Sequence, residues 1–176
     1  MYDTLDRLDR IPGHKELVIV ASGRDTMSHM TYDKILKKVK STPNVTIYAI
    51  TTGAAMRVMA EARYGNNPEF SVANMDYLMA DNQMKTFAQL TGGHWYSPRF
   101  MGELPEDFKE IATSIRNQYT ITYQSSNPKQ DGTYRKLRVA LVGPDDTPLV
   151  VKDEKNKDVK YQIIARDGYT AKHEVD

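Results

Sequence analysis

A polar loop directly after the first apolar run carries the side chains best suited to bind a ligand. Its oxygens belong to Ser22, Asp25, Thr26 and Ser28, and Gly23 would let backbone approach a ligand closely. In open α/β sheets, ligands bind outside the carboxyl ends of the strands, which is where this loop would lie. The structural alternative is that Asp25 or Ser28 caps the next helix and Gly23 permits a tight turn.

A second loop, from Thr51 to Arg57, follows the next apolar run and would lie at the same edge of the sheet. Thr51 and Thr52 therefore join the candidate binding residues. The phosphate-loop pattern is missing here, and Ser22 lacks the Gly-x-Ser-x-Gly setting of a hydrolase nucleophile. We predict no catalytic residues.

Metal and thiol chemistry find little support. The chain has no cysteine, which excludes disulfides, thiolate nucleophiles and cysteine-based metal sites. His14 and His29 would lie at opposite ends of the first strand, while His94 and His173 stand apart from both and from each other. No pair of histidines has the spacing of metal ligands, so we expect no metal and no cofactor.

Composition narrows the class of protein. The 176 residues are 40% hydrophobic and 27% charged, which is typical of a globular chain. A net charge of +1 argues against a nucleic-acid binder. No apolar run approaches the roughly 18 residues of a membrane span, and the acidic, amphipathic start does not resemble a signal peptide.

The positions of apolar residues predict an α/β half. We expect a helix at about 2–10, a strand from Leu17 to Ala21, a helix opening at 31–33 and a strand at 45–50. The continuous apolar run of the first strand suits a parallel strand covered on both faces.

Further elements follow. A helix at 54–62 is expected, and Asp81 or Asn82 would cap another that ends at Gly92. A short strand at 94–96 precedes a helix from Leu104. Three apolar residues would point inward from that last helix: Phe108, Ile111 and Ile115. The methionines between 56 and 101 are interpreted as core filling. The cluster of Trp95, Tyr96, Arg99 and Phe100 is of a type found at contact surfaces, but packing of the last helix on the sheet is the favoured interpretation.

The pattern changes after residue 118 to alternating apolar residues and turn signals. Strands are predicted at 119–123, 137–141, 149–151 and 161–165, which together form an antiparallel extension. The expected division is therefore an α/β domain at 1–118 and a β extension packed on it at 119–176.

Several short motifs follow one another in a specific order, at 13–26, 45–50, 84–93, 103–105, 115–119, 127–129, 131–132 and 166–169. Together they resemble the von Willebrand factor A-related proteins abundant in Acidobacteria. The resemblance implies a Rossmann-like fold with a mostly parallel sheet, adhesion or protein interaction in place of catalysis, and an exported or envelope location.

Two departures from that family bear on function. The family's first strand ends in Asp-x-Ser-x-Ser, the core of its metal-ion-dependent adhesion site, and this motif does not occur here. Ser22 stands where the family has an acidic ligand, so the resemblance implies a degenerate site without metal. The strands before the first helix of this chain are also missing, which implies an N-terminally truncated domain.

The missing first strand would lie beside the strand from Leu17 to Ala21 and leave it as an open apolar edge. We therefore predict a non-enzymatic interaction module that binds a protein partner or self-associates through this edge. The alternative is a small-ligand-binding or hydrolase-like α/β domain that uses the loop at Ser22 to Ser28.

Overall fold

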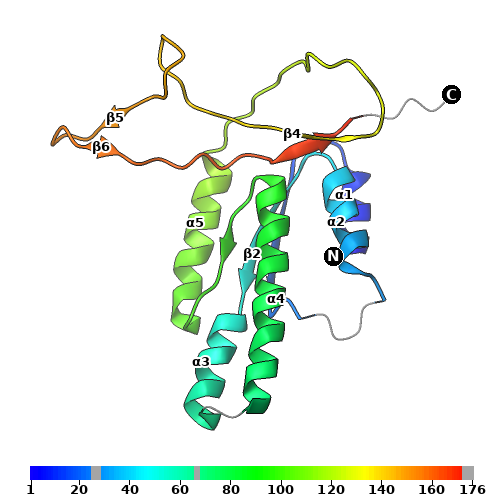
Figure 1. The fold of residues 1–176 in the computed structure, drawn as a ribbon, viewed down its shortest axis with the longest axis vertical. Helices are drawn as coiled ribbons and strands as arrows, with labels where there is room; N and C mark the ends of the chain where they lie inside the picture. The colour runs from blue at the N-terminus through cyan, green and yellow to red at the C-terminus, as the bar shows by residue number, and fades with distance from the viewer. Residues whose placement is uncertain (25–28, 66–67, 172–176) are drawn as a thin grey trace.

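Three parallel strands form the sheet at the centre of the molecule, in the order β1-β2-β3 (Figure 1). The structure is a computed structural model that describes residues 1–24, 29–65 and 68–171, without the side chains of 64 and 68–73. The strands are β1 (Lys15–Ala21), β2 (Val45–Thr51) and β3 (Trp95–Tyr96). With the helices and small antiparallel sheets, this confirms the predicted mixed α/β class.

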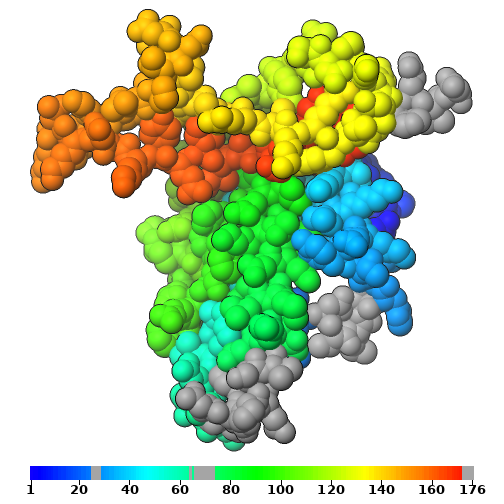
Figure 2. Space-filling view, in the orientation of Figure 1, coloured from blue at the N-terminus to red at the C-terminus, as the bar shows by residue number. Residues whose placement is uncertain are grey.

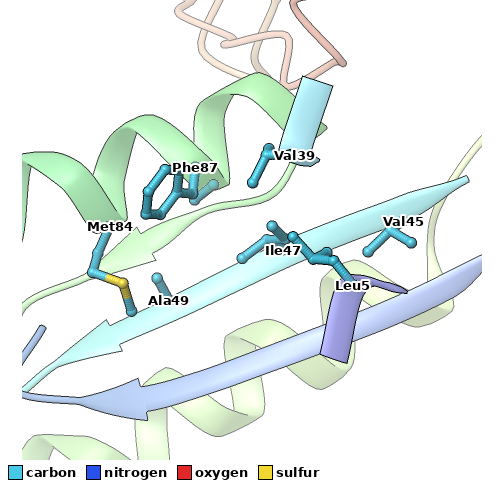
Figure 3. Packing of buried hydrophobic residues seen from close by; sticks show 8 residues of the cluster. Leu5, Val39, Val45, Ile47, Ala49, Met84 and Phe87 are labelled. Carbon is cyan, nitrogen blue, oxygen red and sulfur yellow. The ribbon is translucent and has the colours of Figure 1, made fainter. Parts of the chain in front are cut away.

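Strand β2 is the centre of the core, because all seven of its residues are buried. Val45, Ile47 and Ala49 point to one face, where they pack against Leu5, Val39, Met84 and Phe87 from three helices (Figure 3). Tyr48 and Ile50 point to the other face and pack against Ile111. The alternation follows from the two-residue period of a strand.

The first face is covered by α1 (Tyr2–Asp9), α2 (Tyr32–Ser41) and α4 (Pro68–Thr91). Helix α2 begins as predicted, because the Thr31 side chain accepts a hydrogen bond from the backbone of Lys34 at 3.4 Å. The Lys38 Nζ lies 3.1 Å from Asp6 and 3.2 Å from Asp9, which ties α2 to α1. Hydrogen bonding to Lys38 lowers the pKa of Asp6.

Helices α3 (Gly53–Tyr64) and α4 form a pair that extends past the carboxyl ends of the strands (Figure 1). The predicted cap at Asp81 or Asn82 is wrong, since both lie inside the 24-residue α4. The expectation of core-filling methionines is also wrong for most of them. Met84 is buried. Four methionines of α3 and α4 are exposed because no sheet lies beneath the projecting pair: Met56, Met59, Met75 and Met79. Met101, which precedes α5, is exposed as well.

The second face is covered by α5 (Leu104–Arg116), which follows the short 3₁₀ turn η1 (Met101–Glu103). Ile111 is buried as predicted, but Phe108 and Ile115 are exposed because α5 lies over β2 and β3 and does not reach over β1. In the aromatic cluster Tyr96 is buried, whereas Phe100 is exposed and does not pack the helix on the sheet.

The last residue of α4 supplies a hydrogen-bond acceptor that a neighbouring strand would otherwise provide. Thr91 Oγ1 accepts a hydrogen bond from the Ile47 backbone N–H at 2.9 Å and donates within its own helix, to carbonyls at 3.0 Å. Strand β3 pairs with β2 only from Ala49 onward. The Thr91 hydroxyl therefore satisfies a β2 donor at a position that β3 does not reach.

The C-terminal segment lies across the amino-terminal end of the sheet (Figures 1 and 2). It contains two antiparallel pairs, β4 (Tyr134–Lys136) with β7 (Gly168–Thr170) and β5 (Val151–Lys152) with β6 (Asp158–Val159). Arg166 Nη2 anchors it by donating to the Thr42 carbonyl at 3.0 Å, and burial lowers the pKa of this guanidinium.

Less of this segment is regular than the sequence predicts. Antiparallel pairing is confirmed, but 119–123, 137–141 and 161–165 are not strands, and only Val151 of the predicted strand at 149–151 lies in one, β5. Alternation marks residues that can pair, and these stretches lack a partner strand among the described residues. Their apolar side chains are accordingly exposed: Tyr119, Ile121, Tyr123, Val139, Leu141, Tyr161 and Ile164. The division at residue 118 stays a prediction.

Candidate functional site

The loop after β1 is the first candidate site, and α4 occupies part of the space beside it. Gly23 has a φ of +76°, and a Cβ built there would lie 3.1 Å from the Cβ of Ala80. The glycine therefore serves the close approach of loop and helix. Ser22 is half-buried beside it. Three of the predicted binding residues, Asp25, Thr26 and Ser28, lie outside the described residues.

Ion pairing fixes the described part of this loop to α4. The Arg24 guanidinium lies 3.3 Å from the Asp76 carboxylate and 5.0 Å from the centre of the Tyr77 ring. Both partners belong to α4, and neither was singled out from the sequence. Asp76 and Tyr77 are adjacent in the sequence, and nothing in that pattern indicates a contact with Arg24.

The two threonines after β2 have structural tasks. Thr51 is fully buried; its hydroxyl accepts a hydrogen bond from Trp95 Nε1 at 3.0 Å and donates to the Tyr96 carbonyl at 3.4 Å. The Thr52 N–H donates to the Ala21 carbonyl, and its own carbonyl starts α3. Thr51 is thus not available to a ligand, and Thr52 joins β1, β2 and α3.

Between these loops lies a buried ion pair that sequence reasoning missed. Arg57 Nη1 is 3.0 Å from Asp81 Oδ2, and the Asp81 side chain is 7% exposed. The other oxygen, Oδ1, is buried without a hydrogen-bond partner and lies beside Gly53 at the start of α3. A charged residue within the apolar stripe of α4 was the available signal. The pair joins α3 to α4.

The loops after β1 and β2 offer limited support for the small-ligand or hydrolase-like alternative. Among the described residues, no group of three or more His, Asp or Glu side chains could hold a metal ion. A cavity of about 650 Å³ does exist, but it lies at the opposite end of α4, between Lys85, Trp95 and residues 162–165. The absence of a metal site and of catalytic residues stays a prediction.

The outer edge of β1 is the second candidate site. Lys15 N–H donates to the Asn44 carbonyl and Ala21 accepts from the Thr52 N–H, so odd-numbered residues bond to β2. In a parallel pair the alternate residues turn their N–H and C=O groups away from the partner. Glu16, Val18 and Val20 therefore point theirs outward. Within the described chain, no hydrogen bond reaches these outward groups.

One face of β1 is uncovered as well, which corrects the prediction that both faces are covered. Leu17 and Ile19 pack into the core beneath α1, α2 and α4. On the α5 side, Val18 is 38% exposed and Val20 is 48% exposed. Gln118, just past α5, reaches Glu16 Oε1 at 2.9 Å and Tyr48 Oη at 3.0 Å, so only the start of β1 is covered.

The orientation of α5 shows which of its side chains border this strip. Burial, followed by the charges of Glu110 and Asp107, raises the pKa of Tyr96 on β3 to about 12. Glu110 and Asp107 therefore act on a side chain of β3. At 100° per residue, Phe108 and Ile115 lie on the other side of the buried Ile111 from these acids, which we infer to be the side toward β1. We call the strip formed by Val18, Val20, Phe108 and Ile115 the β1 trough.

No helix among the described residues is long and apolar enough to cross a membrane. A comparison with protein-family models, curated proteins and solved structures finds no match.

Proposed function

We propose that this chain is a non-enzymatic protein-interaction module that binds its partner by completing the sheet at β1. The single observation that carries the proposal is the outer edge of β1, where Glu16, Val18 and Val20 present unpaired backbone groups. A strand of seven residues with such an edge is a template for another strand.

The edge lacks the usual protection against pairing. Soluble proteins protect edge strands with proline, a bulge or inward charges. Strand β1 has neither proline nor a break in its register with β2, and its charged residues, Lys15 and Glu16, are confined to its start. Val18 and Val20 leave the second half of the strand open and apolar.

The β1 trough indicates that the partner brings more than one strand. Neighbouring strands lie about 4.8 Å apart, so a second copy paired through β1 would place its own β2 roughly 14 Å from this one. Helices that pack together need axes about 8–10 Å apart. The two α5 helices would therefore leave Val18 and Val20 uncovered. A partner that supplies a strand together with an apolar helix covers both edge and trough.

This function agrees with the resemblance to von Willebrand factor A-related proteins, which implies interaction in place of catalysis. In that interpretation the sheet is a partial Rossmann-like sheet with a degenerate adhesion site. Ser22 at the end of β1 and the ion pair of Arg57 with Asp81 support the loss of metal binding, because neither supplies the oxygen cluster that Mg²⁺ needs.

Proline substitution tests the edge. The probe tests the edge apart from the trough: it is a fluorescent peptide with the sequence of residues 13–22, whose apolar strand can pair with the edge without supplying a helix. The peptide is titrated into the full chain and followed by anisotropy. Val18→Pro removes an outward N–H and no bond to β2, so we expect folding to persist and peptide affinity to fall at least about tenfold. Ile121→Pro, at an exposed site outside β1, is the matched control and should bind like the original chain.

Hydrogen exchange gives a second, independent measurement. The amides of Glu16, Val18 and Val20 should exchange rapidly in the free chain, and those of Leu17, Ile19 and Ala21 slowly. Equal protection of both sets, or peptide binding unchanged by Val18→Pro, would contradict the proposal.

A further inference from the structure

A second exposed strand edge lies at the far end of the C-terminal segment, in residues 148–161, which we call the arm. The arm is a hairpin of β5 and β6, with Val151 opposite Val159 and Lys152 opposite Asp158. It extends away from the helices (Figures 1 and 2). An isolated two-stranded hairpin is marginally stable in water, so the arm needs further support.

The turn of the arm is well defined. Asp153 N–H donates to the Lys157 carbonyl at 2.9 Å, and Asp153 Oδ1 accepts from the N–H groups of Lys155 and Lys157 at 2.8 and 2.9 Å. Asn156 adopts the left-handed conformation that the turn needs, with a φ of +59°. These bonds fix the register of β5 with β6.

That register determines which backbone groups of β6 are free. Asp153 and Lys157 form a hydrogen-bonded pair, and such pairs alternate with non-bonded pairs along an antiparallel ladder. Asp158, in the next pair, therefore turns its N–H and C=O away from β5. Lys160 directly follows the last residue of β6, and continuing the alternation by two residues gives it the same orientation. The free edge of the arm thus presents Asp158 and Lys160.

From this edge we infer that the arm pairs with the arm of a second copy of the chain, antiparallel and centred on Val159. In this register Asp158 of each copy lies opposite Lys160 of the other. All four outward-turned residues exchange backbone hydrogen bonds, and both directly opposite pairs carry opposite charges. The neighbouring registers that the backbone allows place Asp158 opposite Asp158 or Lys160 opposite Lys160, where like charges repel.

The side chains of the arm add an apolar face. Because side chains alternate, one face of the hairpin carries Leu149, Val151, Val159 and Tyr161, all of which are exposed. Pairing the two arms gives a four-stranded sheet with this face continued across the centre, where the two Val159 side chains meet. Three or more strands with an apolar face are what a hairpin needs for stability. The interface is small, so the dimer is weak.

Complementary charge reversals test the pairing by sedimentation equilibrium of the full chain over a range of micromolar concentrations. Asp158→Lys gives an all-positive edge and Lys160→Asp an all-negative one, so each variant alone should self-associate about tenfold more weakly. An equimolar mixture should recover association, because each edge then meets its opposite. Lys155→Asp, in the turn and off the edge, is the matched control and should behave like the original chain.

The outcomes separate this inference from the proposed function. A mixture that associates no better than its components, or an original chain that stays monomeric throughout, would overturn arm pairing. Association that persists in Lys160→Asp but disappears in Val18→Pro would overturn it too, and would assign self-association to β1. Lys160→Pro removes only an outward N–H, so loss of the dimer there with an unchanged circular dichroism spectrum would support the pairing independently of charge.

Discussion

Strands β1 and β2 have the same length, lie in register and carry similar apolar residues, but their surroundings differ. All seven residues of β2 are buried, whereas β1 has one packed face, one open face and one free edge. Both strands are apolar enough to be central strands. Among the described residues, however, only β2 is paired along both edges and buried on both faces. The difference shows that β1 carries apolar side chains, Val18 and Val20, that the described residues leave exposed.

The largest expected effect on stability is at Gly93, which packs directly against the backbone of β2. A Cβ at Gly93 would overlap the carbonyl oxygen of Ile47, and rigid backbone cannot move away as a side chain can. Gly93→Ala should therefore cost more than about 4 kcal/mol of unfolding free energy, measured by urea denaturation. Gly102→Ala, where a Cβ meets nothing within 4 Å, is the control. A near-normal Gly93→Ala would mean that β2 is not closed on this side.

Truncation of each strand tests the contrast directly. Ile47 is fully buried between helices and sheet, so Ile47→Ala should cost about 2–5 kcal/mol by the same measurement. Val20 on β1 is nearly half exposed, and Val20→Ala should cost less than about 1 kcal/mol. Similar losses at the two positions would show that β1 is covered in solution and would remove the basis for the β1 trough.

The smallest effect concerns the two sides of α5. On the β3 side, burial raises the pKa of Asp107, and Glu110 and Glu103 add to the shift. A carboxyl group whose folded pKa exceeds its unfolded value of 3.8 disfavours folding when it is charged. Asp107→Asn should therefore raise the thermal midpoint at pH 7, and the difference should vanish below about pH 3.8. The exposed Glu106→Gln serves as control. An unchanged midpoint at pH 7 would indicate that this side of α5 is also open.

Local periodicity was sufficient to predict most of the α/β half. The positions of apolar residues predict a helix that opens at 31–33 and a strand at 45–50, and the structure has α2 and β2 there, because each pattern matches one element's geometry. Periodicity does not say what lies beyond an element. The exposure of Val18 and Phe108 depends on which strands and helices adjoin them, so neither was predictable from their own segments.

The predictions for polar residues fail for a related reason, because the roles of these residues depend on contacts with distant segments. The sequence predicts a helix cap at Asp81 or Asn82, since these residue types favour that position, but Asp81 pairs with Arg57 of another helix and is buried in the middle of α4. The part of the first candidate site that is described is likewise explained by packing, with Gly23 against Ala80. Contacts between distant segments decided both cases.

The hydroxyl of Thr91 has a consequence for how the molecule opens. It joins the last turn of α4 to the backbone of β2, so the helix end cannot fray without releasing an amide in the middle of the sheet. Helix and strand should therefore open as one cooperative unit, with hydrogen exchange at Ile47 as slow as global unfolding allows. Among the described residues, β1 has no such link on its outer side, so we expect its fluctuations to stay local and its edge to be accessible while the rest of the core remains closed.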